Sequence, residues 1–185
     1  MTGALDPRAL GPQDVILADP PWKFASNSEA LPGRNPRRHY PCMSVGEIAE
    51  MPVAVLAAPS ALLLMWVTVP FAAAAHDVMR AWGFRYVSQV VWIKERIGTG
   101  YWARNRHELL YIGKRGDFPC PVPVLFPDSV VVGQQREHSR KPDLVHQVID
   151  ARLGHMRRCE LFARTRRAGW TVWGNQAEKF SKAAE

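Results

Sequence analysis

The sequence predicts an α/β domain with a doubly wound, mostly parallel sheet and helices on both of its faces. Three observations lead to this fold class: the strand segments are apolar throughout, they alternate with helical segments, and the 185 residues have the length of one domain. A strand that is apolar on both sides must be covered on both sides, as in a parallel sheet between two helix layers. We therefore treat residues 1–185 as a single domain.

Short apolar, β-branched or aromatic runs predict the strands, which lie at residues 15–18, 62–69, 86–93, 108–112, 160–163 and 170–173. We expect Gly113 to end the fourth of these strands. Ser44 and Glu47 have the spacing of a capping box, which begins a short helix. The helices are expected between Ser44 and Pro52, between Pro70 and Gly83, and from Pro142 onward.

The overall composition is that of a globular protein, with 47% hydrophobic and 22% charged residues. The three cysteines (Cys42, Cys120 and Cys159) are far apart and form no CxxC pair, which argues against disulfides and predicts a cytoplasmic location. No apolar run approaches the roughly 18 residues of a membrane span, and residues 1–12 lack the features of a secretory signal. The six histidines show no HExxH or paired spacing, so no metal is expected.

The net charge of +7 makes nucleic acid the first partner to consider. Only six of the 24 basic residues are lysines, and the arginine that dominates suits phosphates and stacks on bases. A surface charged only for solubility is the alternative reading.

Two long loops, residues 23–41 and 95–106, interleave arginines with aromatic residues, as a surface that binds a nucleic-acid strand would. Solvated charged loops are the alternative. The candidate nucleic-acid-binding residues are Arg34, Arg37, Arg38 and Tyr40 in the first loop, and Tyr101, Trp102, Arg104 and Arg106 in the second.

The tetrapeptide Asp19-Pro20-Pro21-Trp22 directly follows an apolar strand, and its four residues are the candidate catalytic group. The prolines remove two N–H donors, which leaves a carboxylate, carbonyl acceptors and an indole. The Asp19 carboxylate and the Pro20 carbonyl can each accept one N–H of an exocyclic amine, while Trp22 stacks on the ring that carries it. A proline-rich turn beside a core tryptophan is the structural alternative.

This box resembles the active-site box of the permuted adenine-N6 methyltransferases, a family that includes the catalytic subunit of the eukaryotic mRNA adenosine methyltransferase. Further segments match motifs of the family in family order: Tyr40-Pro41-Cys42-Met43-Ser44, Leu64-Met65-Trp66-Val67-Thr68, Trp92-Ile93-Lys94, Thr99-Gly100-Tyr101-Trp102, His107-Glu108, His138-Ser139-Arg140-Lys141-Pro142, Glu160-Leu161-Phe162-Ala163-Arg164 and Gly174-Asn175-Gln176. The resemblance implies a Rossmann-like methyltransferase fold with a permuted motif order.

The resemblance also implies S-adenosylmethionine as methyl donor and S-adenosylhomocysteine as product. Lys141, at a helix start, is a cation for the carboxylate of the donor. Asn175 and Gln176 can bind ribose hydroxyls or the adenine edge, and Glu160 and Arg164 are implied to contact the ribose and the amino-acid end. The full implied donor-binding set is Asp19, Ser139, Lys141, Glu160, Arg164, Asn175 and Gln176.

The function expected from this resemblance is methylation of the N6 amine of adenine in DNA. DNA is favoured because the chain looks like a compact bacterial or phage member of the family. Three alternatives stay open: an RNA adenosine N6-methyltransferase, a non-catalytic nucleic-acid-binding subunit, and a methyltransferase for a small molecule. A homodimer or a partner subunit is also left open.

Overall fold

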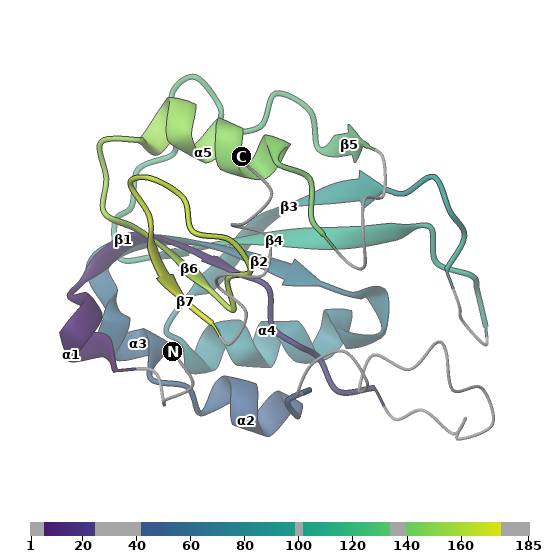
Figure 1. The fold of residues 1–185 in the computed structure, drawn as a ribbon, viewed down its shortest axis with the longest axis horizontal. Coiled ribbons are helices and arrows are strands. Elements are labelled where there is room, and N and C mark those ends of the chain that lie inside the picture. The colour runs from purple at the N-terminus through teal and green to yellow at the C-terminus, as the bar shows by residue number, and fades with distance from the viewer. Residues whose placement is uncertain (1–5, 25–41, 99–101, 134–139, 175–185) are drawn as a thin grey trace.

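The computed structural model of the chain describes residues 6–24, 42–98, 102–133 and 140–174. These residues form one seven-stranded sheet with helices on both faces (Figure 1). In chain order the elements are α1 (Pro7–Leu10), β1 (Gln13–Ala18), α2 (Val45–Ala49), α3 (Val53–Leu56), β2 (Ala57–Val67), the 3-10 turn η2 (Val69–Phe71), α4 (Ala72–Ala81), β3 (Arg85–Ile93), β4 (His107–Arg115), β5 (Val130–Val132), α5 (Leu144–Leu153), β6 (Arg158–Leu161) and β7 (Thr171–Trp173).

The strand order is β5-β3-β4-β2-β1-β6-β7. The β1–β2, β1–β6, β6–β7 and β3–β5 pairs are parallel, whereas β4 runs antiparallel to both of its neighbours, β2 and β3. The predicted mostly parallel α/β sheet is therefore confirmed.

The two faces of the sheet are covered by different helices: α5 lies on one face, and α2, α3 and α4 lie on the other (Figure 1). Side chains of β1 alternate between the two cores, because successive strand residues point to opposite faces. Ile16 and Ala18 pack with the α2–α4 layer, while Val15 and Leu17 pack with α5.

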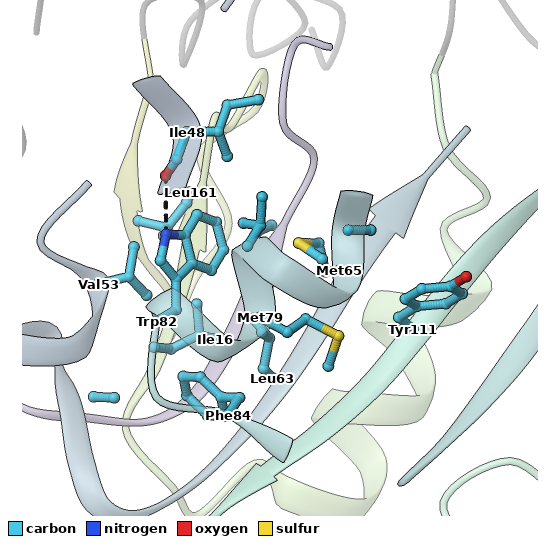
Figure 2. Packing of buried hydrophobic residues seen from close by; sticks show 14 of the residues in the cluster. Ile16, Ile48, Val53, Leu63, Met65, Met79, Trp82, Phe84, Tyr111 and Leu161 are labelled. Atoms are coloured by element: carbon cyan, nitrogen blue, oxygen red, sulfur yellow. Dashed lines mark hydrogen bonds between the residues drawn. The ribbon is translucent and has the colours of Figure 1, made fainter. Parts of the chain in front are cut away.

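The indole of Trp82 joins α4 to α2 within the first of these cores. Its ring is fully buried, and its Nε1–H donates a 2.9 Å hydrogen bond to the Ile48 carbonyl oxygen (Figure 2). Helix α2 begins at the capping box that the sequence predicts, where the Ser44 hydroxyl and the Glu47 carboxylate each bind the backbone amide of the other. These contacts fix the segment that follows the first long loop.

Gly113 does not end its strand, contrary to the sequence-based expectation, because β4 continues to Arg115. Gly113 pairs with Leu63 on one side and with Tyr86 on the other. A Cβ at this position would collide with the terminal methyl group of Met79. The glycine therefore permits α4 to pack closely on the sheet, as isolated strand glycines often do.

The sequence reading missed the short elements α1, α3 and β5, and it began β2 too late. Residues 25–41 of the first predicted loop lie outside the described residues, as do residues 99–101 of the second. Among the helices of the described segments, none has the length and apolar character needed to cross a membrane.

Candidate functional site

One edge of the sheet gathers the polar side chains that follow its strands. Strands β1, β2 and β6 are parallel, so Asp19, Thr68 and Phe162 follow their carboxyl ends at the same edge. Because β4 is antiparallel, its first residues, including Glu108, also lie at this edge, next to Lys94 after the end of β3. In open α/β sheets, ligands bind beyond the carboxyl ends of the strands.

Backbone hydrogen bonds hold the Asp-Pro-Pro-Trp turn in place. The Asp19 amide donates to the Leu161 carbonyl oxygen at 3.3 Å, which ties the turn to the end of β6. The Met43 amide donates to the Pro21 carbonyl oxygen at 2.8 Å, so the turn is also tied to the segment before α2. The Pro20 carbonyl oxygen accepts the Trp22 amide at 2.9 Å and keeps one lone pair for a further donor.

Trp22 is a buried side chain in this structure, which corrects the expectation that it stacks on the substrate base. Its side chain is 4% exposed, and its ring already stacks on Phe71 with centroids 5.2 Å apart. The indole Nε1–H donates to the Trp66 carbonyl oxygen at 3.2 Å. The indole thus anchors the turn to β2, and its face is not available to a ligand.

Lys141, which lies just before α5, pairs directly with the box carboxylate. Its Nζ lies 2.8 Å from Oδ1 and 2.9 Å from Oδ2 of Asp19. The same ammonium lies 3.2 Å from Oε2 of Glu108 and 5.6 Å from the ring centroid of Trp66. Only 13% of the Lys141 side chain and 19% of the Asp19 side chain are exposed, so this contact is largely shielded from water.

Glu108 links two ammonium groups, because Oε1 accepts a hydrogen bond from Lys94 while Oε2 faces Lys141. Burial by itself would raise the pKa of Glu108, but Lys141 and Lys94 together hold that pKa below its ordinary value. Burial would likewise lower the pKa of Lys141, and the carboxylates of Asp19 and Glu108 raise it instead. Glu108 is therefore held as a carboxylate and Lys141 as an ammonium.

The pocket beside this cluster combines apolar and charged walls, and its lining includes Trp66, Phe162, Glu160 and Arg164 together with Asp19 and Lys141. Oε2 of Glu160 lies 2.9 Å from Nε2 of His146 on α5. The backbone of Phe162 has φ of 63°, an uncommon conformation for a residue with a side chain, and one that recurs at functional sites. In the described segments, no group of three His, Cys, Asp or Glu side chains could hold a metal ion.

The structure brings four of the predicted donor-binding residues to this one pocket: Asp19, Lys141, Glu160 and Arg164. Eight further predicted site residues fall outside the described part of the chain, where they stay predictions: Ser139, Asn175 and Gln176 of the donor set, and Arg34, Arg37, Arg38, Tyr40 and Tyr101 of the nucleic-acid set.

The described part of the second loop is tied together at its base and exposed beyond it. The Gly98 amide donates to the Asn105 carbonyl oxygen at 2.9 Å. Trp102 is fully exposed, and Arg104 and Arg106 are exposed as well. An exposed tryptophan beside two arginines is compatible with the predicted nucleic-acid contact, which stays a prediction.

Sequence reasoning gave Glu108 and Lys94 no role in the site. Both residues lie in motifs that it noted, Trp92-Ile93-Lys94 and His107-Glu108. The signal that could have placed them is the direction of β4, since only an antiparallel strand brings its first residues to the edge where the parallel strands end.

Comparison with known proteins shows to which protein family this chain is related. Residues 13–176 match the MT-A70 family, over most of the length of the sequence. The chain belongs to the MT-A70 family. This finding confirms the resemblance drawn from the Asp-Pro-Pro-Trp box and the motifs that follow it.

Among the MT-A70 relatives, an Arabidopsis thaliana protein named N(6)-adenosine-methyltransferase MT-A70-like is 30% identical over 90% of this chain and 24% of its own length. Human N(6)-adenosine-methyltransferase catalytic subunit METTL3 is 28% identical over 94% of this chain and 30% of its own length. The Type II methyltransferase M.MunI of Mycoplasma sp is 27% identical over 86% of this chain and 76% of its own length. The chain thus spans about a quarter of the length of the first relatives it matches, and most of the length of M.MunI.

Proposed function

We propose that this MT-A70 protein transfers a methyl group from S-adenosylmethionine to the N6 amine of adenine in DNA. The observation that carries the proposal is the intact Asp-Pro-Pro-Trp turn at the carboxyl end of β1, with its carboxylate paired to a largely buried lysine. A subunit that only bound nucleic acid would have no need of a partly buried carboxylate beside a cleft.

The residues of the pocket suit the methyl donor, whose amino-acid end carries both charges. The Lys141 ammonium can hold the donor carboxylate, and Glu160 can accept hydrogen bonds from ribose hydroxyls. Trp66 and Phe162 supply apolar walls for the rest of the molecule. Arg164 adds positive charge close enough to oppose the protonation of Lys141.

When bound, the donor supplies an electrophilic methyl group on a sulfonium. The protein's task is then to present the adenine amine, which is a poor nucleophile because its lone pair is delocalised into the ring. Asp19 and the Pro20 carbonyl can each accept one amine N–H, which localises that lone pair. The Asp19 carboxylate also balances the positive charge that develops on N6 in the transition state.

DNA is proposed over RNA from the match to the Type II methyltransferase M.MunI, most of whose length the chain covers. The net charge of +7 suits either nucleic acid. An adenine in duplex DNA must leave the base stack before it can reach a buried carboxylate. RNA is the second candidate, because the Arabidopsis and human relatives are named adenosine methyltransferases. A cytoplasmic location, and a homodimer or partner subunit, remain parts of the proposal that rest on the sequence alone.

Arg104 and Arg106, exposed residues of the second loop, are proposed to bind the nucleic-acid backbone. Reversing the charge of Arg104 and Arg106 should weaken binding of all sequences alike and flatten its dependence on salt, since each lost phosphate contact removes about one released counterion from the slope. Trp102→Ala should lower affinity with little change in that slope, because stacking releases no counterions. Fluorescence anisotropy over a salt series measures both quantities.

The decisive experiment is transfer of a labelled methyl group from S-adenosylmethionine to matched pools of single- and double-stranded DNA and RNA, followed by nucleoside analysis. We expect N6-methyldeoxyadenosine in a DNA pool and none with an Asp19→Ala variant. Labelled N6-methyladenosine from RNA alone would decide for the second candidate. A protein that binds both pools but methylates neither would be a binding subunit.

A further inference from the structure

His146, on α5, contacts one of the acids that line the pocket beside Asp19. Its Nε2 lies 2.9 Å from Oε2 of Glu160, which stands near the end of β6. An ionised carboxyl group can only accept a hydrogen bond, so the imidazole donates through Nε2. Only 9% of the His146 side chain and 14% of the Glu160 side chain are exposed, so little water competes for this contact.

The imidazole is itself held in one orientation by the core behind it. Its ring lies edge-on to the ring of Trp170, with centroids 5.2 Å apart and planes at 62°. Trp170 is buried, and its Nε1–H donates a 2.8 Å hydrogen bond to Oδ1 of Asp150, which follows His146 on α5. The guanidinium of Arg158 lies 5.5 Å from the ring centroid of Trp170. His146 therefore cannot turn away from Glu160 without disturbing several packed side chains.

The contact with His146 fixes the direction of the Glu160 carboxylate in the pocket. Because Oε2 accepts from the imidazole, the plane of the carboxylate is set, and Oε1 can accept from a hydroxyl group of a ligand. A carboxylate that rotated freely would lose this freedom when it bound such a hydroxyl, and the loss would reduce the affinity. The structure thus orients Glu160 before any ligand arrives.

We infer that His146 is a positioning residue, which holds Glu160 in the direction required to bind the ribose hydroxyls of the methyl donor. The inference rests on the proposed function, because the ribose belongs to S-adenosylmethionine. His146 acts only through Glu160, so it contributes to binding of the donor and not to the rate of methyl transfer.

Two ligands separate this role from a general effect on the pocket. S-adenosylhomocysteine carries both ribose hydroxyls, whereas its 2′,3′-dideoxy analogue carries neither and keeps the adenine and the amino-acid end. In His146→Leu, which retains an apolar side chain beside Trp170, S-adenosylhomocysteine should bind about tenfold more weakly by calorimetry. The dideoxy analogue should bind equally to the wild type and to His146→Leu, because it offers Glu160 no hydroxyl.

Two amide substitutions test the geometry of the contact. In His146→Gln the side-chain nitrogen can reach the place of the imidazole Nε2, so this variant should bind S-adenosylhomocysteine nearly as tightly as the wild type. In His146→Asn the amide is one methylene shorter and reaches only the place of Nδ1, so the loss of affinity should remain. Because the two variants carry the same polar group, a difference between them reports where the hydrogen-bond donor lies.

Methyl transfer supplies the second readout. In His146→Leu the KM for S-adenosylmethionine should rise by the same factor, while kcat at saturating donor stays unchanged. His76→Leu is the matched control, because His76 also contacts two rings, those of Tyr86 and Tyr111, but lies on α4 on the opposite face of the sheet (Figure 1). His76→Leu should change neither KM nor kcat.

Unchanged affinity in His146→Leu, or an equal loss for the two ligands, would overturn the inference. Binding by His146→Gln that is as weak as that by His146→Asn would overturn it too, and this comparison decides alone if His146→Leu does not fold. If the wild type methylates adenine and these results fail, only the role of His146 is wrong. If the wild type neither binds S-adenosylhomocysteine nor methylates, the proposed function is wrong, and the inference with it.

Discussion

Replacing Asp19 by asparagine tests the centre of the site with almost no change of shape. The amide keeps one acceptor oxygen but has no charge to balance the positive nitrogen of the transition state. Removal of one preorganised group of this kind costs on the order of a hundredfold or more in rate. Activity should therefore fall by about that factor in Asp19→Asn, while the nucleic acid is still bound.

Asp19→Asn should also lower the free energy of unfolding, by an amount that the contacts of Lys141 limit. Lys141 keeps one acceptor oxygen but loses the other and the negative charge, and a hydrogen bond to a charged group is worth about 1.5–3 kcal/mol. Glu108 remains 3.2 Å from the ammonium and retains part of the pairing, so the free energy of unfolding should fall by about 1–3 kcal/mol rather than by the larger cost of an unpaired buried charge.

Labelled methyl transfer at saturating donor measures the rate of Asp19→Asn, and urea unfolding measures its stability. A folded Asp19→Asn protein that turns over like the wild type would refute the role of the carboxylate. A variant that cannot fold would refute the claim that Glu108 retains the ammonium.

Four further substitutions, one of them a control, test the fold at the site and away from it. Trp22→Phe keeps the ring contact with Phe71 and loses one hydrogen bond, so it should lower the free energy of unfolding by about 1 kcal/mol, as measured in urea. The KM for nucleic acid should stay unchanged. A raised KM would instead support stacking of Trp22 on the substrate base. Gly116→Ala should cost about 2–5 kcal/mol, because φ is +57° and a Cβ would collide with a backbone carbonyl oxygen, whereas Gly46→Ala meets nothing and should be tolerated. A hydrogen bond from the Arg157 guanidinium lowers the pKa of Asp14, so Asp14→Asn should lose at most about 1 kcal/mol of stability. This loss should be present at a pH above the ordinary carboxyl pKa and should vanish as the pH falls through the lowered pKa of the native state. An equal difference in melting temperature at acid and neutral pH would contradict this.

Most of the sheet and part of the site could be predicted from the sequence. The apolar strands predict a sheet that is covered on both faces. In a parallel sheet of this kind, Asp19 and the residues after β6 lie at the same edge, beyond the carboxyl ends of the strands. Glu160 was assigned only through the family resemblance, and the structure places it at the same pocket as Asp19. A local pattern is sufficient for Asp19, because this residue directly follows its own strand.

Long-range contacts decide what the sequence could not predict. Gly113 looked like a strand end, but it is the point where the side chain of Met79 approaches the sheet. Trp22 looked like an open stacking surface, but Phe71 and the backbone of β2 enclose it. Neither Met79 nor Phe71 is close in sequence to the residue that it contacts. The antiparallel direction of β4, which brings Glu108 to the site, likewise has no local sequence pattern that would predict it.

The site and the surface carry their charges in different ways, and this difference has a measurable consequence. The charged side chains of the site pair with one another in a cluster that has little access to solvent: Lys141 with Asp19 and Glu108, and Lys94 with Glu108. Salt therefore screens their interactions weakly. The excess of positive charge lies elsewhere in the chain, and Arg104 and Arg106 are two exposed examples of it. Raising the salt concentration should therefore weaken nucleic-acid binding steeply while the affinity for S-adenosylhomocysteine changes little. Parallel salt dependences of the two affinities would mean that the donor, too, is held by exposed charge rather than by the buried lysine.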